Sequence, residues 1–172
     1  MASALGGHRM IFMSPVKEPD FFSRFDETDQ IDQQDVDTYL SHFRKAKDEP
    51  IVGEASVNYL DSERAAEHIH AFAPDAKVLV SLRNPFKRLI SLYEMYVRHG
   101  LEQTLEYATI SDPWLASQCL YANRLKRFSD VFPREQIFVV HFDDLESKWS
   151  ETIEDVCGIL SIPAEARPKP PV

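Results

Sequence analysis

The chain has 172 residues, 44% of them hydrophobic, which fits one domain with a core of ordinary size. Its net charge of −9 argues against broad binding to nucleic acid or anionic membranes, although a local basic pocket stays open. No apolar run is long enough to span a membrane, and the first ten residues lack the basic-then-apolar order of a signal peptide. The distant Cys119 and Cys157 indicate free thiols in a reducing compartment, so we expect a cytoplasmic protein.

The first half of the chain alternates short strand-like runs with helical patterns. Apolar residues recur at helical spacing after Asp32, and Asp61 or Ser62 is placed to cap a second helix. The elements predicted here are a strand at residues 11–13, a helix over 32–45, a strand at 50–54 and a helix that ends at 72.

The second half begins with a buried-type strand, and the pair Asn84-Pro85 then suits a helix N-cap followed by proline at the first helical position. Gly100 is placed to end this helix. The elements predicted here are strands at 77–82 and 136–142 and helices over 85–99, 104–108, 113–131 and 147–160. Residues 164–172 form a proline-rich tail that fits neither a helix nor an inner strand.

Strands that alternate with helices predict an α/β fold with a mostly parallel sheet covered on both faces. In such sheets ligands bind at the carboxyl ends of the strands. Glu54, Arg83 and the residues after Phe142 are therefore the first candidates for a binding site.

The segment from Arg83 to Ser91 carries the strongest local signal. Arg83 follows a buried strand directly, and the helix that begins next brings unpaired N–H groups and a positive dipole end close to it. An arginine can hold a phosphate through two parallel hydrogen bonds, and the Ser91 hydroxyl is a further donor on the face of Lys87 and Arg88. The alternative is that Arg83 pairs with a carboxylate and Ser91 only packs.

Leu82-Arg83-Asn84-Pro85, followed by Arg88, Ser91 and Tyr93, resembles the 3′-phosphate-binding segment of sulfotransferases that use 3′-phosphoadenosine 5′-phosphosulfate (PAPS). In that family an arginine at a strand end and a serine eight residues later hold the 3′-phosphate. Four further segments resemble the family in the same order, namely residues 12–22, 53–60, 132–140 and 142–145. The resemblance covers about residues 3–163, so residues 1–163 are expected to form one sulfotransferase domain.

The resemblance implies a three-layer α/β fold related to P-loop nucleotide kinases. It also implies transfer of a sulfuryl group from PAPS to a hydroxyl or amine of a carbohydrate or small molecule, without a metal. By the same resemblance Glu18 is the base that takes the acceptor proton, and Lys17 stabilises charge or holds an acidic acceptor. The alternative is that Lys17 and Glu18 are a solvent-exposed pair in a loop without a catalytic role. Asp20 and Ala55 stand where the carbohydrate-acting branch often has histidine and lysine, which argues against a heparan-type acceptor.

The remaining candidates come from the same resemblance. Glu54 and Ser56 lie in the acceptor-side loop, and Tyr121 matches a tyrosine that the family places near the nucleotide, with a core aromatic as the alternative. His68 and His70 are two apart on a predicted helix and share no face, which excludes a metal site there.

Family members open with a strand and a Lys-x-Gly-Thr-Thr loop around the 5′-phosphosulfate, and nothing before Met10 matches it. We therefore expect a truncated, weak or inactive sulfotransferase domain, with a gap or exposed edges where that central strand belongs. The alternative is a non-catalytic remnant that binds nucleotide or a partner protein. A nucleotide kinase is disfavoured because the chain has no Gly-rich loop with Lys-Ser/Thr. The sequence leaves open which molecule accepts the sulfuryl group and whether the chain forms a homodimer.

Overall fold

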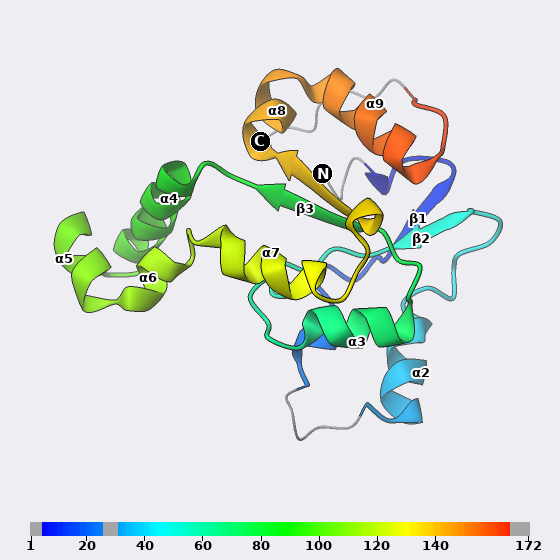
Figure 1. The fold of residues 1–172 in the computed structure, drawn as a ribbon, viewed down its shortest axis with the longest axis horizontal. Coiled ribbons are helices and arrows are strands. Elements are labelled where there is room, and N and C mark those ends of the chain that lie inside the picture. Colours follow the sequence, from blue (N-terminus) through cyan, green and yellow to red (C-terminus); the bar gives the residue numbers. More distant parts are fainter. Residues whose placement is uncertain (1–4, 26–30, 166–172) are drawn as a thin grey trace.

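The computed structural model describes residues 5–25 and 31–165, so residues 166–172 of the predicted proline-rich tail lie outside the described part. Four parallel strands lie among helices in an α/β arrangement (Figure 1). The strands are β1 (Ile11–Met13), β2 (Ile51–Gly53), β3 (Val78–Leu82) and β4 (Ile137–His141). The expectation of an α/β fold with parallel strands and flanking helices is thereby confirmed.

The helical elements include two single 3-10 turns, η1 and η2. In chain order they are η1 (Phe21–Ser23), α2 (Gln33–Ser41), α3 (Ala65–Phe72), α4 (Pro85–Arg98), α5 (Leu105–Ser111), α6 (Pro113–Ser117), α7 (Tyr121–Ser129), η2 (Arg134–Gln136), α8 (Phe142–Ser147) and α9 (Trp149–Leu160).

The described strands form two separate two-stranded sheets, β1–β2 and β3–β4, rather than one continuous sheet. Ile11 lies opposite Ile51 in the first sheet, and Val78 lies opposite Ile137 in the second. Both pairs are parallel, as connections through helices require. Among the described strands, no ladder joins one pair to the other.

Helices cover both faces of these strands. On one face α9 packs Ile153 and Cys157 against Ile11, while Val156 packs against Val140 of β4. On the other face Ala66 of α3 and Phe128 of α7 form a cluster with Ile137. These buried clusters make three layers, in which the strands are the middle one.

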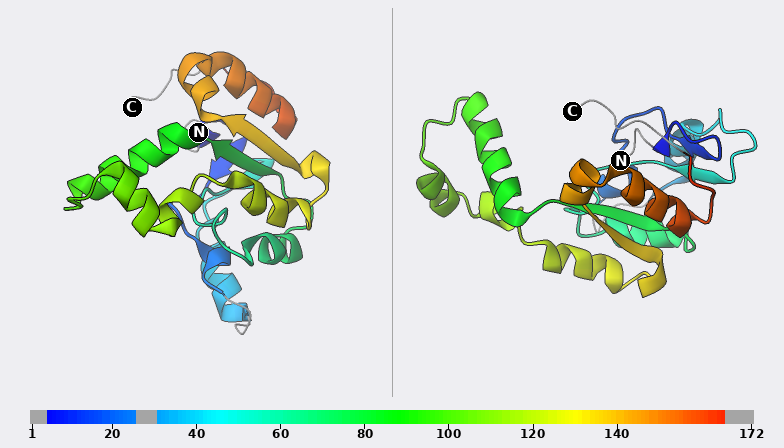
Figure 2. Two further views of the ribbon diagram at one scale, coloured as in Figure 1. Left: turned by 60° about the vertical axis from the view of Figure 1, so that its left-hand side comes forward. Right: turned by 90° about the horizontal axis from the view of Figure 1, so that it is seen from above.

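Helices α4, α5 and α6 extend away from this body as an arm that is connected to β3 by an extended link (Figures 1 and 2). The Asn84 side chain accepts hydrogen bonds from Phe86 N–H and Lys87 N–H, and Pro85 occupies the first turn, so the predicted cap is confirmed. Gly100 ends the helix with a φ of 99°, in the left-handed region that glycine adopts without strain. No residue of α4 is buried.

Three predicted helices were drawn too long or in the wrong place. The helix predicted over 113–131 is broken between α6 and α7, because the Gln118 carbonyl accepts hydrogen bonds from Arg88 Nε at 3.1 Å and Arg124 Nη1 at 2.9 Å. The first helix ends at Ser41 rather than residue 45. The last predicted helix is α9, which begins at Trp149 rather than residue 147. The separate helix α8 precedes it, where the sequence predicted the end of a strand and a turn over residues 142–145.

Candidate functional site

Arg83 lies directly after the carboxyl end of β3, where the sequence placed it. Its guanidinium carbon lies 5.3 Å from the centroid of the Phe142 ring, at the start of the helix that follows β4. The Arg83 Nε atom is buried and has no hydrogen-bond partner among the described residues. A buried donor without a partner is costly, so it points to a group that accepts this hydrogen bond when bound.

The helix N-terminus beside Arg83 is less open than the sequence predicted. The Asn84 side-chain oxygen already binds the N–H groups of Phe86 and Lys87, at 3.0 and 3.3 Å. The Lys87 ammonium forms an ion pair with Asp143 Oδ2 at 2.9 Å. The cap and this ion pair therefore occupy donors that we expected to face an anion, and Arg83 stays the main candidate.

Tyr121 begins α7 and lies near Arg83 and Arg88. Its hydroxyl is buried and close to the Arg83 backbone, without a hydrogen bond of normal geometry among the described residues. Burial raises the pKa of this hydroxyl above its usual value of 10.0, while the charge of Arg88 acts in the opposite direction. The structure thus brings Tyr121 to the end of β3, with a second polar atom that has no partner.

Two further residues complete this region and were missed in the sequence. Gln118, only 3% exposed, binds Arg88 through its backbone and side-chain oxygens and binds Arg124 through its backbone oxygen. Arg124 also forms an ion pair with Asp61 Oδ1 at 2.9 Å. The contacts of Arg88 with Gln118 and of Arg124 with Asp61 join segments that lie far apart in the chain, so no local spacing predicts them.

Ser91 lies in α4, seven residues after the N-cap Asn84, and is partly buried. This spacing puts it two turns along the helix, on the same side as Asn84. No contact between Ser91 and Arg83 is observed among the described residues. Its place in a phosphate site stays a prediction.

Lys17 and Glu18 lie in the loop after β1. Glu18 has a φ of 50° and Asp20 a φ of 52°, so two non-glycine residues of this loop adopt the left-handed conformation. The Lys17 side chain is 91% exposed, and its Nζ lies 3.8 Å from Glu18 Oε1. The loop therefore presents an accessible carboxylate and ammonium on a backbone that needs external support.

Glu54 follows β2, and its carboxylate accepts hydrogen bonds from other residues of the chain. Its Oε2 accepts a hydrogen bond from Ser56 Oγ at 2.8 Å, its Oε1 accepts one from the Tyr59 hydroxyl, and the Tyr39 hydroxyl also contacts the carboxylate. Burial raises the pKa of Glu54, and the hydrogen bonds from Tyr59 and Ser56 oppose that rise. Burial and the neighbouring Glu54 charge raise the pKa of Tyr39 and Tyr59, so both stay neutral donors.

The residues after Glu54 bind the loop of Glu18. The Asp20 N–H donates to Ser56 Oγ at 2.9 Å, Asn58 Nδ2 donates to Asp20 Oδ2 at 2.8 Å, and the Phe22 N–H donates to the Tyr59 hydroxyl at 3.5 Å. Glu54 and Ser56 are expected to contact the acceptor, and that contact stays a prediction. In the structure their polar atoms also support the left-handed loop.

Two groups of candidate residues thus lie at strand ends, one around Arg83 and one around Glu18. Among residues 5–25 and 31–165 no hydrogen bond or ion pair joins the two groups. Nor does that part of the chain contain a cluster of three or more metal-ligating side chains.

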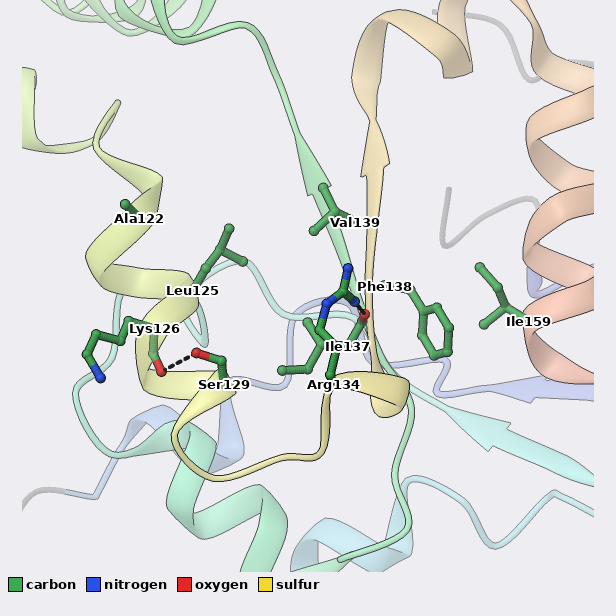
Figure 3. A pocket seen from close by; sticks show the side chains of 9 residues that line it. All are labelled: Ala122, Leu125, Lys126, Ser129, Arg134, Ile137, Phe138, Val139 and Ile159. Atoms are coloured by element: carbon green, nitrogen blue, oxygen red, sulfur yellow. Dashed lines mark hydrogen bonds between the residues drawn. The ribbon is translucent and has the colours of Figure 1, made fainter.

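A pocket of about 540 Å³ lies elsewhere, between α7 and β4 (Figure 3). Its lining includes Leu125, Phe138 and Val139, and Arg134 Nη1 donates to the Ile137 carbonyl at its rim at 3.1 Å. None of the candidate residues lines this pocket. It is separate from both groups at the strand ends.

Parallel strands lie between helix layers, with an arginine at the end of one strand and an acidic loop after another, as expected for an α/β fold that binds its ligands at the strand ends. The pattern described as Sulfotransferase family matches residues 11–166, and the chain belongs to that family. A sulfotransferase from Alicyclobacillus acidocaldarius has a similar structure, with a TM-score of 0.81 and 30% identity over 96% of this chain and 76% of that one. The sulfotransferase domain from the curacin biosynthetic pathway has a TM-score of 0.55 at 17% identity, with 77% and 45% coverage, and shows the fold alone.

Curated relatives include enzymes of heparan sulfate synthesis. The human heparan sulfate glucosamine 3-O-sulfotransferase 6 is 29% identical over 145 residues, which are 76% of this chain and 39% of that protein. The bifunctional heparan sulfate N-deacetylase/N-sulfotransferase 1 of Caenorhabditis elegans is 23% identical over 141 residues, 74% of this chain and 16% of that protein. The chain therefore spans well under half the length of these relatives. No helix in the described ranges has the length and apolar character that crossing a bilayer demands.

Proposed function

We propose that this chain binds PAPS and transfers its sulfuryl group to a hydroxyl or amine of a carbohydrate or small-molecule acceptor. The observation that carries the proposal is the pair of buried polar atoms without partners at the end of β3, Arg83 Nε and the Tyr121 hydroxyl. Two unsatisfied groups at a strand end fit a nucleotide phosphate, because its oxygens accept from both. Membership of the sulfotransferase family supports the 3′-phosphate of PAPS as this ligand.

Each candidate residue then has a defined task. Arg83, Tyr121 and Ser91 hold the 3′-phosphate end of the nucleotide. Glu18 accepts the proton of the acceptor hydroxyl or amine, and Lys17, whose ammonium is exposed, neutralises charge nearby. PAPS supplies the activated sulfuryl group. Glu54 and Ser56 lie on the acceptor side and also support the loop that carries Glu18.

The proposed acceptor class is a carbohydrate or a small molecule. Relatives that act on heparan sulfate support a sugar, as their names state. The neutral Ala55 and acidic Asp20 in the acceptor-side loops favour an acceptor with less negative charge than heparan sulfate.

Calorimetric titration with 3′,5′-bisphosphoadenosine tests the nucleotide site directly. Arg83→Ala is expected to weaken binding by about tenfold or more, because a charge-assisted hydrogen bond contributes about 1.5–3 kcal/mol. Arg98→Ala, at the far end of the helix that follows Arg83, is the matched control and is expected to leave affinity unchanged. Equal affinity of wild type and Arg83→Ala, or no binding by a folded wild-type chain, would overturn the proposed site.

Transfer of radioactive sulfate from labelled PAPS to a panel of sugars and phenols tests the reaction itself. Glu18→Gln keeps the size of the side chain but removes the base, so turnover is expected to fall about 100-fold or more while nucleotide binding stays unchanged. Sulfation at the wild-type rate by Glu18→Gln would exclude Glu18 as the base. Binding without transfer to any acceptor would favour a non-catalytic nucleotide-binding domain.

A further inference from the structure

The contact between Arg88 and Gln118 lies between the two candidate residues Arg83 and Tyr121, and it has no task in the proposed reaction. Helix α4 follows Arg83 closely, whereas Tyr121 is the first residue of α7. The arm of α4, α5 and α6 separates them in the chain (Figure 1). Arg88 belongs to the start of this arm, and Gln118 follows its last helix, so their contact joins the two ends of the arm.

Gln118 accepts two hydrogen bonds from the Arg88 guanidinium. Arg88 Nε donates to the Gln118 carbonyl at 3.1 Å, and Arg88 Nη2 donates to Gln118 Oε1 at 3.3 Å. Gln118 is buried, whereas no residue of α4 is, so this contact attaches an otherwise accessible helix to a buried point. A guanidinium that binds two oxygens fixes direction as well as distance. The contact therefore sets how α4 lies relative to the junction of α6 and α7.

The same carbonyl of Gln118 also holds the first turn of α7. Arg124 Nη1 donates to it at 2.9 Å, and Arg124 Nε forms the ion pair with Asp61. Leu120, the N-cap residue of α7, makes no side-chain hydrogen bond to the helix start, so this turn lacks a local cap. Tyr121 lies between Gln118 and Arg124 in the chain. Its position therefore depends on the tertiary contacts of these two residues.

The two polar atoms without partners at the end of β3 come from the two segments that this contact joins. Arg83 Nε precedes α4, and the Tyr121 hydroxyl begins α7. Both atoms are buried, and the hydroxyl lies close to the Arg83 backbone. They can share one ligand only while α4 and the start of α7 keep their relative position. The contact of Arg88 with Gln118 supplies that restraint.

We propose that Arg88 and Gln118 are positioning residues, whose contact holds the Tyr121 hydroxyl beside Arg83 and so makes one anion site from two distant segments. Neither side chain touches the ligand, because the Arg88 fork is occupied by Gln118 oxygens. Both residues act through Tyr121. The placement of Tyr121 needs no ligand, whereas the identity of the ligand as a nucleotide phosphate rests on the proposed function.

Chemical labelling of the ligand-free chain tests the placement of Tyr121 by itself. N-acetylimidazole acetylates accessible tyrosine hydroxyls, and mass spectrometry gives the rate at each tyrosine. Gln118→Met removes Oε1 at similar side-chain length, and it is expected to speed acetylation of Tyr121 about fivefold or more, because the buried hydroxyl becomes accessible. Ser117→Ala, which removes an exposed hydroxyl that donates to the Trp114 carbonyl, is the control and is expected to leave the rate unchanged. An unchanged rate in Gln118→Met would overturn the proposal.

Calorimetric titration with 3′,5′-bisphosphoadenosine tests the link from Gln118 to the ligand. Gln118→Met is expected to weaken binding about fivefold, as Tyr121→Phe does, because each removes one donor from the phosphate. The double variant is expected to bind at most about twofold more weakly than Tyr121→Phe, since Gln118 acts through that hydroxyl. Losses that multiply, or lower stability at unchanged affinity, would overturn the positioning role. If the wild-type chain binds no nucleotide, the proposed function fails, while the acetylation rates still decide whether Gln118 holds Tyr121.

Arg88→Lys is the second variant and separates the shape of the side chain from its charge. Lysine keeps the positive charge but lacks the planar fork that binds both Gln118 oxygens. We expect faster acetylation of Tyr121 and about fivefold weaker nucleotide binding, as for Gln118→Met. Wild-type behaviour of Arg88→Lys would overturn the role of the fork. Weaker binding without faster acetylation would mean that Arg88 contacts the phosphate directly, which also contradicts the proposal, and Arg88→Lys decides alone if Gln118→Met does not fold.

Discussion

The Ser56 hydroxyl accepts a hydrogen bond from the Asp20 backbone N–H at 2.9 Å and donates one to Glu54 Oε2 at 2.8 Å. Asp20 has a φ of 52°, and Glu18, two residues earlier, has a φ of 50°. Left-handed backbone at non-glycine residues costs about 1–2 kcal/mol each and persists where surrounding contacts over-determine it. Ser56 is thus the link through which the buried carboxylate of Glu54 fixes the loop that presents Glu18.

Ser56→Ala tests this link. The substitution leaves the Asp20 N–H and one Glu54 oxygen without their partner, so the free energy of unfolding is expected to fall by about 1–3 kcal/mol. Urea unfolding followed by circular dichroism measures the loss. Ser129→Ala is the control, because that hydroxyl is exposed and binds only a carbonyl of its own helix. A loss no larger than that of the control would show that Ser56 does not support the loop.

The pH dependence of stability tests the burial of Glu54. Burial raises the pKa of this carboxyl above 4.5 in the folded protein, so the charged form is disfavoured there. A raised pKa gives a contribution to stability that is present below the unfolded pKa and is lost as pH rises through the folded pKa. The stability of wild type relative to Glu54→Gln, measured by urea unfolding, is expected to be highest at and below about pH 4 and to decline from there toward neutral pH.

The Tyr59→Phe substitution is a second test of how the pKa of Glu54 controls the pH dependence of stability. The Tyr59 hydroxyl donates to Glu54 and so lowers the pKa of the carboxyl, against the effect of burial. Removal of this donor is expected to move the decline in stability to a higher pH. If the relative stability of wild type and Glu54→Gln does not change between pH 4 and 7, the carboxyl of Glu54 is not buried in solution.

Arg124 and Asp61 form an ion pair whose burial distinguishes it from the surface pairs. The Arg124 side chain is 11% exposed and Asp61 is 36% exposed, with 2.9 Å between Nε and Oδ1. Arg124→Ala is expected to lower the free energy of unfolding by about 1–3 kcal/mol, because Asp61 and the Gln118 carbonyl lose a charged donor. A double-mutant cycle with Asp61→Asn isolates the pair.

The exposed pair of Lys126 and Asp130 is the matched control for that cycle. It lies on the same helix and is 68% and 55% exposed. Its coupling energy is expected to be about 0.3–0.5 kcal/mol, as for other exposed pairs at this helical spacing. Equal coupling energies for both pairs would mean that burial of Arg124 adds nothing to the contact between α7 and the segment before α3.

Elements with local signals were predicted well from the sequence. Asn84, Pro85 and Gly100 predicted the two ends of α4 correctly. An N-cap, a proline in the first turn and a left-handed glycine each determine the backbone of only a few neighbouring residues, so they can be recognised in the sequence. The break after Ser117 was missed, because Arg88 of the separate helix α4 donates hydrogen bonds to Gln118 at that point. Tertiary contacts of this kind produce no periodic pattern of residues in the sequence.

The same distinction holds for the candidate site. The position of Arg83 at a strand end followed from an apolar run that stops at a charged residue, and the structure places it there. The support of Glu54 by Tyr39 and Tyr59 was not foreseen. Tyr39 reaches the carboxylate from a separate helix, and only packing in three dimensions brings it close.

Tyr121→Phe separates a binding role from a structural one. The Tyr121 hydroxyl is buried without a hydrogen bond of normal geometry, so its removal is expected to leave the free energy of unfolding unchanged or to raise it by up to about 1 kcal/mol. The affinity for 3′,5′-bisphosphoadenosine is expected to fall about fivefold, because the phosphate loses a donor.

Calorimetry and urea unfolding on the same preparation measure both effects of Tyr121→Phe. Phe128→Leu, a conservative change in the core of the same helix, is the control that lowers stability and leaves affinity unchanged. A hydroxyl that served only packing would give the opposite result for Tyr121→Phe, with lower stability at constant affinity. That outcome would remove Tyr121 from the nucleotide site and leave Arg83 as its one buried donor without a partner among the described residues.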